Sequence, residues 1–193
     1  MPRSNVKLIP GYYFHIYNRA VSDDLLFVED KNYYFFLLKI KKYLLTDSDV
    51  LAYCLMPNHY HLILKIKSDQ FSSSMHKFAL SYVVAFNKMY HRKGRLYISP
   101  FQRIHIQNPS YLLHLSKYIH KNPLKAKLVT RVGDWKYSSY CEYIGKREID
   151  FINPGFILDI LSDDINSSIV DQQKDYREFV EDRDEVLQKN FVP

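Results

Sequence analysis

Hydrophobic and polar residues alternate along the first half of the chain in two rhythms, one typical of strands and one typical of helices. Period-two alternation at residues 12–19, 59–67 and 100–106, with an apolar run at 50–56, predicts four strands. The strands at 50–56 and 59–67 form a hairpin around Pro57 and Asn58. Helical spacing predicts one helix over residues 31–45. A longer helix is expected from the N-capping serines at 72–74 to about Gly94.

The second half of the chain is predicted to be mainly helical. Asn108 precedes a helix that should run to about Lys121, because Pro123 disfavours a helical conformation in Asn122, the residue before it. Asp134 could cap a helix over 135–143, and two helical stretches follow Gly145. The order strand, helix, strand, strand, helix, strand is that of a ferredoxin-like split βαβ domain. This is an α+β fold in which an antiparallel sheet carries its helices on one face.

Charge divides the chain unevenly. Residues 1–147 hold 23 of the 27 Lys and Arg and 9 of the 21 Asp and Glu, a net charge of +14, whereas residues 148–193 carry −8. We therefore expect a domain over 1–147 and an acidic, mainly helical extension over 148–193. A body this basic favours a polyanionic partner such as nucleic acid, although a solvated basic surface is an equal alternative on charge alone.

Several classes of protein are disfavoured by composition. No run of about 18 apolar residues is present and the N-terminus lacks a signal-peptide pattern, so we expect a cytoplasmic protein without a membrane partner. Cys54 and Cys141 lie far apart in apolar or aromatic surroundings. This placement indicates reduced, buried thiols and not a disulfide framework or a zinc cluster.

Two histidines give the sharpest local signal. His59 and His61 stand two apart on a predicted strand and therefore project from the same face, where two neutral imidazoles suit a divalent metal. The alternative is that they are ordinary half-buried strand residues with satisfied hydrogen bonds.

A second signal lies near the end of the helix that follows Asn108. Tyr118 and Asn122 are four residues apart and so share one helical face, from which a phenol and an amide oxygen could reach one site. A phenol with a pKa of about 10 is a poor nucleophile unless a metal makes the attacked phosphorus more electrophilic. The alternative for Tyr118 is a core-facing aromatic side chain.

Together, the segments PNHYHLIL at 57–64 and YIHKNPLKAKLV at 118–129 resemble the single-tyrosine HUH transposases, and among them the REP-associated tyrosine transposases. HIYNRA near the start and WKYSSY at 135–140 also look familial, so the resemblance covers roughly residues 8–145. It implies that His59, His61 and Asn122 hold a divalent metal, Mg²⁺ or Mn²⁺, and that Tyr118 is the nucleophile.

Three residues qualify the resemblance. Tyr60 replaces the bulky hydrophobic residue expected between the histidines, and on a strand it should face away from them. The spacing around Arg103 differs from the family's basic aromatic stretch, which leaves a DNA contact by Arg103 in doubt. His114, one turn before Tyr118, competes with Asn122 as a ligand or as a proton acceptor.

The function implied by the resemblance is metal-dependent nicking and rejoining of single-stranded, hairpin-associated DNA through a 5′-phosphotyrosine intermediate. A catalytically silent nucleic-acid-binding protein on the same fold is the main alternative. A phosphohydrolase is a weaker one, since one histidine pair without a carboxylate cluster is little for two metals. Relatives are monomers or homodimers, so a homodimer stays open.

The acidic segment 148–193 supports two interpretations. It could fold over the basic DNA surface and restrain the enzyme, or it could be a helical extension that packs on the body or mediates dimerisation. The second interpretation is the simpler one.

Overall fold

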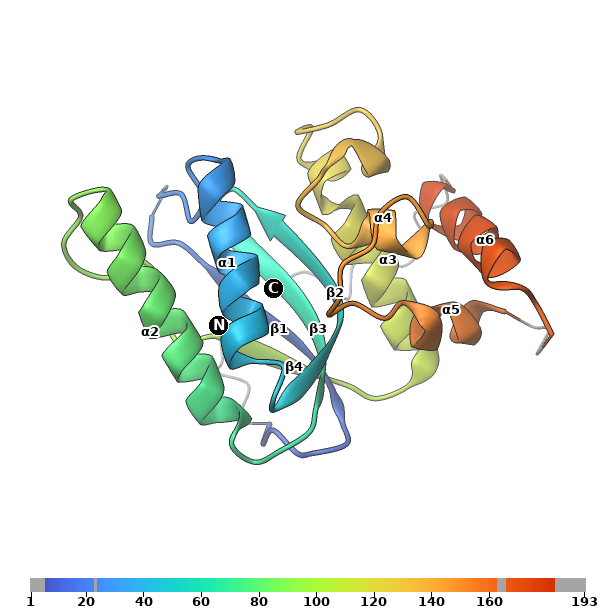
Figure 1. The fold of residues 1–193 in the computed structure, drawn as a ribbon, viewed down its shortest axis with the longest axis horizontal. Helices are drawn as coiled ribbons and strands as arrows, with labels where there is room; N and C mark the ends of the chain where they lie inside the picture. The colour runs from blue at the N-terminus through green and yellow to red at the C-terminus, as the bar shows by residue number, and fades with distance from the viewer. Residues whose placement is uncertain (1–5, 23, 163–165, 183–193) are drawn as a thin grey trace. The chain divides into compact units, whose positions relative to one another are not determined.

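Four strands form one sheet in the order β2-β3-β1-β4 (Figure 1). The computed structural model describes residues 6–22, 24–162 and 166–182. The strands are β1 (Tyr13–Arg19), β2 (Ser48–Met56), β3 (His59–Ile66) and β4 (Gln102–Ile106), and two helices, α1 (Asp30–Tyr43) and α2 (Phe71–Met89), separate them along the chain. Neighbours β1 and β3 run antiparallel. This strand order and chain order are those of the predicted ferredoxin-like α+β fold, which is thereby confirmed.

Helices α1 and α2 pack against each other and against one face of the sheet (Figure 1). The ring of Phe36 on α1 lies 5.0 Å from the ring of Tyr60 on β3 and 4.9 Å from that of Phe78 on α2. All three side chains are buried. Tyr60 therefore points into the helical layer and away from its two histidine neighbours, as the strand alternation predicts.

The start of α2 differs from the prediction. The helix begins at Phe71 with Gln70 as its N-cap, so the serines at 72–74 occupy its first turn and do not cap it. The hydroxyls of Ser68 and Ser74 donate to the carboxylate of Asp47. Ser74 is thus engaged by a residue that precedes β2 by one position and is distant in sequence, which local spacing does not reveal.

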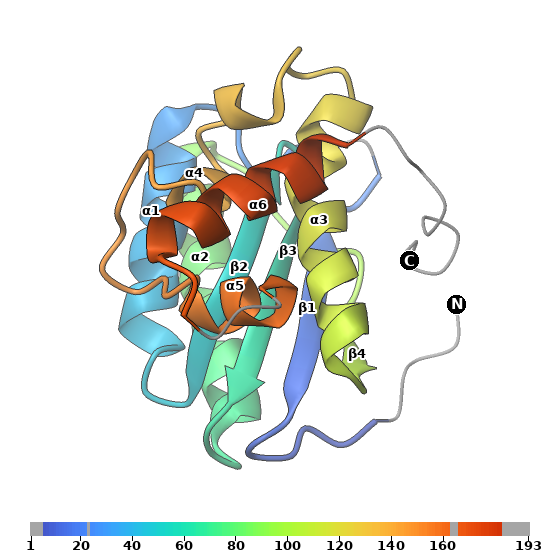
Figure 2. The ribbon, with the colours of Figure 1, turned by 90° about the vertical axis from the view of Figure 1, so that its right-hand side faces the viewer.

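The chain folds into two compact units, Met1–Val50 with Leu55–His105 and Leu51–Cys54 with Ile106–Pro193. The second unit contains α3 (Pro109–Lys125), a short 3₁₀ helix (Val132–Asp134), α4 (Tyr140–Tyr143), α5 (Gly155–Leu161) and α6 (Ile169–Glu181). The two helical stretches predicted after Gly145 are confirmed as α5 and α6. Both pack against α3 (Figure 2). Within the described residues, no helix is long and apolar enough to span a bilayer.

The prediction that α3 ends at about Lys121, before Asn122 and Pro123, was wrong. The helix begins as expected, with the Asn108 side chain accepting from the backbone N–H of Tyr111 at 2.8 Å. It continues through Pro123 to Lys125 because the backbone N–H of Ala126 still donates to the carbonyl of Asn122. A proline this near the end removes one hydrogen bond without disrupting several following turns.

The single helix predicted over 135–143 is also absent. In its place stand the 3₁₀ turn and the four-residue α4, joined by a turn that contains one bridge residue. Ser138 in that stretch forms an isolated antiparallel bridge with Cys54 of β2, and the backbone N–H of Ser139 donates to the carbonyl of Tyr53. Tertiary pairing with a strand therefore overrides the local helical pattern.

Candidate active site

The face of β1 and β3 opposite to α1 and α2 carries several polar side chains. The register pairs Tyr17 with His61 and Arg19 with His59, and opposed residues of antiparallel strands project to the same side. His15, two residues before Tyr17, shares this face. The sequence thus gathers three imidazoles and one guanidinium on two central strands.

His59 and His61 are adjacent on this face, as their spacing predicts. Their ring centroids are 5.0 Å apart and the rings are nearly perpendicular. His61 is buried and His59 is half-buried. Nδ1 of His59 lies 2.7 Å from Oδ1 of Asn58, and Nδ1 of His61 lies 2.9 Å from Nε2 of His15.

Both histidines are electrically neutral at pH 7. Burial lowers the pKa of His59 to about 4, and the charge of Arg19 adds to this effect. Burial also lowers the pKa of His61 well below its usual value, with smaller contributions from His15 and His59. The neutral imidazole is the form that binds cations.

These histidines fit a divalent cation in their charge state and in their outer contacts. Metal-binding histidines usually engage their second ring nitrogen in a hydrogen bond, and both do so here through Nδ1. In the parts of the chain that the structure describes, no group of three or more His, Cys, Asp or Glu is placed to hold a metal ion. A third ligand from the described residues would therefore be of another type, such as an amide or a phenol oxygen.

Tyr118 and Asn122 lie one turn apart on α3. Tyr118 is half-buried; burial raises its pKa above the usual value, while a hydrogen bond with the Asn122 side chain lowers it and partly offsets this. The ammonium group of Lys125 stands 5.0 Å from the centre of the Tyr118 ring. The phenol is consequently protonated at neutral pH, and it needs help to act as a nucleophile.

Each unit brings together its own pair of predicted site residues. His59 and His61 belong to the first unit, and Tyr118 and Asn122 belong to the second. The convergence of the two pairs on one cation stays a prediction.

His114, the competing candidate for a ligand, and Arg103, the doubtful DNA contact, both have structural contacts. The ring of His114 lies 5.4 Å from that of Phe179 on α6, and burial lowers its pKa. Nε of Arg103 donates to the backbone carbonyl of Val6 at 2.6 Å. Both contacts give these side chains a role in packing or in anchoring the chain.

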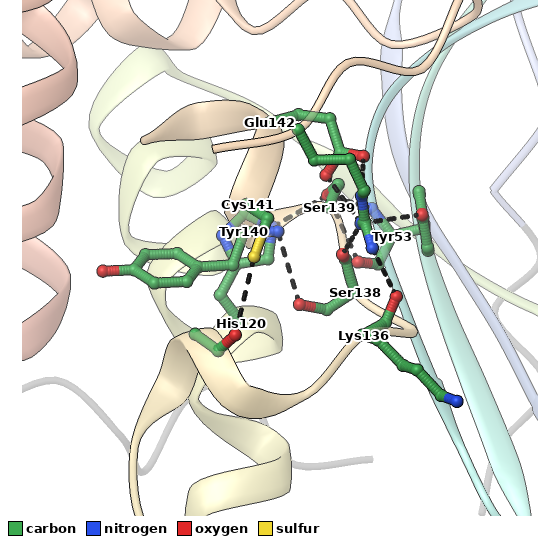
Figure 3. A network of polar contacts seen from close by, with 10 residues as sticks. Tyr53, His120, Lys136, Ser138, Ser139, Tyr140, Cys141 and Glu142 are labelled. Atoms are coloured by element: carbon green, nitrogen blue, oxygen red, sulfur yellow. Dashed lines mark hydrogen bonds and ion pairs between the residues drawn. The ribbon is translucent and has the colours of Figure 1, made fainter. Parts of the chain in front are cut away.

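A buried polar network holds α3 within the second unit (Figure 3). His120 lies two residues after Tyr118 and is fully buried. Its Nδ1 is 2.9 Å from the hydroxyl of Tyr176 on α6, and its Nε2 is 2.8 Å from Oγ of Ser139. Ser139 in turn accepts from the backbone N–H of Tyr53 at 2.9 Å. The imidazole therefore ties the tyrosine-bearing helix to β2 and to α6.

Helix α6 is thus a packing element of this unit. Tyr176 and Val180 are buried, and the Tyr176 hydroxyl donates to Oγ of Ser116 on α3 at 2.8 Å. These contacts favour the interpretation of the acidic segment as an extension that packs on the body. The carboxylates of α6 lie on the same helix as this apolar stripe, in the usual arrangement of an amphipathic helix.

We expect Tyr176→Phe to destabilise the chain by about 1–3 kcal/mol, because it leaves Nδ1 of His120 buried without its partner. The measurement is urea unfolding at pH 7. Tyr12→Phe, on a tyrosine that is 48% exposed, is the matched control and should change little. Equal stability of Tyr176→Phe and wild type would contradict the role given to the network.

Acidification should destabilise the fold through His120. Burial lowers its pKa to about 3, whereas the unfolded chain takes up a proton near pH 6.5. Between these values the unfolded state binds more protons, so the contribution to stability is complete above about pH 6.5 and is lost as pH falls towards 3. The slope is about 1.4 kcal/mol per pH unit for one such histidine.

Urea unfolding of wild type and His120→Asn at pH 7 and pH 5 measures this effect. The variant should be less stable at pH 7 but should lose less stability on acidification. The difference in slope from wild type should correspond to the uptake of about one proton on unfolding. An unchanged pH slope in the variant would show that His120 does not titrate as its burial requires.

His15 and Arg19 were not singled out from the sequence. Their signal is present in the alternation of residues 13–19, which puts His15, Tyr17 and Arg19 on one face. The sequence does not reveal that this face is shared with His59 and His61, because that depends on the pairing of β1 with β3.

The fold of this chain is shared with a protein of known structure. A solved structure of a REP-associated tyrosine transposase bound to a REP hairpin is similar over 78% of this chain and 96% of its own chain, with a TM-score of 0.64 and 18% sequence identity. At this identity, the likeness shows a shared fold. No protein-family model and no curated protein sequence matches the chain.

Proposed function

We propose that this protein is a metal-dependent single-strand DNA nickase and strand transferase that acts on hairpin-associated DNA. The observation that carries the proposal is the pair of neutral imidazoles on one sheet face, the half-buried His59 and the buried His61, each with Nδ1 already hydrogen-bonded. The likeness in fold to a transposase that binds a DNA hairpin supports the choice of substrate. The resemblance of the two motifs supports the choice of reaction.

His59, His61 and the amide oxygen of Asn122 would hold the cation, Mg²⁺ or Mn²⁺. When bound, such a cation withdraws charge from a phosphodiester oxygen and makes the phosphorus more electrophilic. This help is needed because the pKa of Tyr118 is raised by burial and the phenol is not ionised at neutral pH.

Tyr118 would supply the nucleophilic oxygen. A bond forms between that oxygen and phosphorus while the bond from phosphorus to the 3′ oxygen breaks. The phenol loses its proton and the departing 3′ oxygen gains one, which leaves a 5′-phosphotyrosine and a free 3′-hydroxyl. Attack by a 3′-hydroxyl reverses the step and rejoins DNA, so no nucleotide cofactor is needed.

Arg19 offers a phosphate contact beside the histidine pair. It is exposed, stands opposite His59 in the strand register, and its side chain makes no hydrogen bond or ion pair with any residue that the structure describes. A guanidinium suits a phosphate because it presents several donors in a planar fork.

The test is the formation of a covalent protein–DNA adduct. Wild-type protein is mixed with a labelled oligonucleotide that carries a hairpin and a single-stranded flank, in Mg²⁺, in Mn²⁺ or in EDTA, and the products are separated under denaturing conditions. We expect an adduct with either metal and none in EDTA. Hairpin binding without an adduct under any of these conditions would instead identify a catalytically silent binding protein.

A further inference from the structure

His15 makes a contact that the proposed reaction does not yet use. It is fully buried on β1, and its Nε2 lies 2.9 Å from Nδ1 of His61. The two rings stack, with centroids 5.1 Å apart and planes inclined by 24°. The contact therefore constrains both the position and the orientation of the His61 ring.

The desolvation free energy of burying the His15 ring is offset by one hydrogen bond, the one to His61. Nδ1 of His15 is buried and has no hydrogen-bond partner among the described residues, so the contact to His61 is the polar interaction that the structure provides for this ring. His120, the other fully buried histidine off the metal pair, engages both of its nitrogens. A histidine that serves only the interior would be expected to resemble His120.

The hydrogen bond between His15 and His61 has two proton arrangements. A neutral imidazole carries one N–H and one lone pair. If Nε2 of His15 donates, the proton of His61 sits on its Nε2, which then cannot bind a cation. If Nδ1 of His61 donates, the lone pair of His61 sits on Nε2 and is available as a ligand.

Asn58 fixes which ring nitrogen of His59 carries the proton. Its side-chain oxygen lies 2.7 Å from Nδ1 of His59 and can only accept, so Nδ1 carries the proton and Nε2 carries the lone pair. An acceptor behind His61 would give the two histidines matching forms. His15 is the residue in place to be that acceptor.

We propose that His15 is a positioning residue for the cation site: it accepts the Nδ1–H of His61 and thereby keeps Nε2 of His61 as a lone-pair ligand. This inference rests on the proposed function, because it assigns His15 a purpose only if His61 binds a cation. It predicts that His15 affects cation binding without touching the cation.

The experiment measures Mn²⁺ binding by electron paramagnetic resonance in the folded full-length chain without DNA. His15→Phe keeps a ring but removes both nitrogens, and outer contacts of this kind are worth about 10–100-fold in metal affinity. We expect a loss in that range. His15→Gln retains an oxygen acceptor and should bind Mn²⁺ more tightly than His15→Phe.

His105→Phe is the matched control. It removes an imidazole from β4 of the same sheet, where the His105 ring packs against Tyr12 and Phe14 at centroid distances of 5.2 and 5.3 Å. Its Mn²⁺ affinity should equal that of wild type. Nitrogen-15 NMR of wild type with Mg²⁺ gives a second readout, in which the proton of His61 is expected on Nδ1.

Each outcome separates the two claims. Equal Mn²⁺ affinity of wild type and folded His15→Phe overturns the role of His15 but leaves the proposed function standing. Absence of Mn²⁺ binding by wild type overturns the cation site and His15's role with it. If His15→Phe does not fold, a proton found on Nε2 of His61 in the Mg²⁺ sample overturns the role of His15 and also removes His61 as a ligand through that atom. Mn²⁺ binding by wild type then decides whether a cation site remains without His61.

Discussion

Replacing Tyr118 with Phe is expected to abolish the covalent protein–DNA adduct while hairpin affinity stays close to that of wild type. The substitution removes one oxygen, the atom proposed to attack phosphorus, and keeps the ring that packs on α3 beside Lys125. Because the adduct contains a bond to that oxygen, Tyr118→Phe should form no adduct at this position. The measurement combines a denaturing gel for the adduct with fluorescence anisotropy for DNA binding.

Tyr111→Phe is the control for this result. Tyr111 stands on the same helix near its N-terminus, and the change removes an equivalent hydroxyl. It should leave adduct formation unchanged. An adduct that persists in Tyr118→Phe and disappears in Tyr111→Phe or another tyrosine variant would move the nucleophile away from Tyr118.

His59→Ala is expected to reduce cleavage by roughly 10³-fold, since a cation supplies several kcal/mol of transition-state charge stabilisation. His59 is a better choice than His61 for this test because it is half-buried and its loss should disturb the sheet less. Hairpin affinity in EDTA should be unchanged, because no cation is then present in either protein. Single-turnover cleavage rates across a Mn²⁺ series give the measurement.

The exposed His76 on α2 provides the matched control, and His76→Ala should cleave at the wild-type rate. Recovery of His59→Ala at high Mn²⁺ would strengthen the assignment, because a weakened site fills at a higher concentration. Cleavage by His59→Ala at the wild-type rate and with the wild-type Mn²⁺ dependence would remove His59 from the site.

The order of strands and helices was predictable because each element of the first unit carries its own periodicity. Alternation in β1 and β3 and the stripe of Phe78, Tyr82, Phe86 and Met89 predicted on α2 are local signals. The structure buries the first three residues of the stripe, whereas Met89, at the end of the helix, is 47% exposed. The same alternation correctly separates Tyr60 from its histidine neighbours. Local patterns of this kind survive because tertiary packing agrees with them.

The elements that were predicted wrongly are those decided by distant partners. Ser74 is bound by Asp47, and Ser138 pairs with Cys54, so neither follows its local signal. Pro123 breaks the rule for a different reason: it lies close enough to the end of α3 for the last turn to form around it.

In the candidate site, too, the residues related by local spacing were predicted and those related by tertiary structure were not. Spacings of two on a strand and four on a helix were enough to pair His59 with His61 and Tyr118 with Asn122. His15 could not be found, because its contact with His61 joins residues 46 positions apart and depends on strand register. Convergence of the two pairs is likewise a matter of tertiary structure, and it stays a prediction that the Tyr118 and His59 variants address together.

The second unit is assembled from two separate stretches of chain, which limits the fragments of this protein that can fold. Residues 51–54 emerge from the ribosome long before residue 106, yet the hydroxyl of Tyr143 donates to the carbonyl of Leu51 and Ser139 bonds to Tyr53. A fragment that starts at residue 106 would lack these acceptors and donors. The tyrosine-bearing helix therefore cannot be transplanted as a cassette, and any engineered chimera has to carry the β2 segment with it.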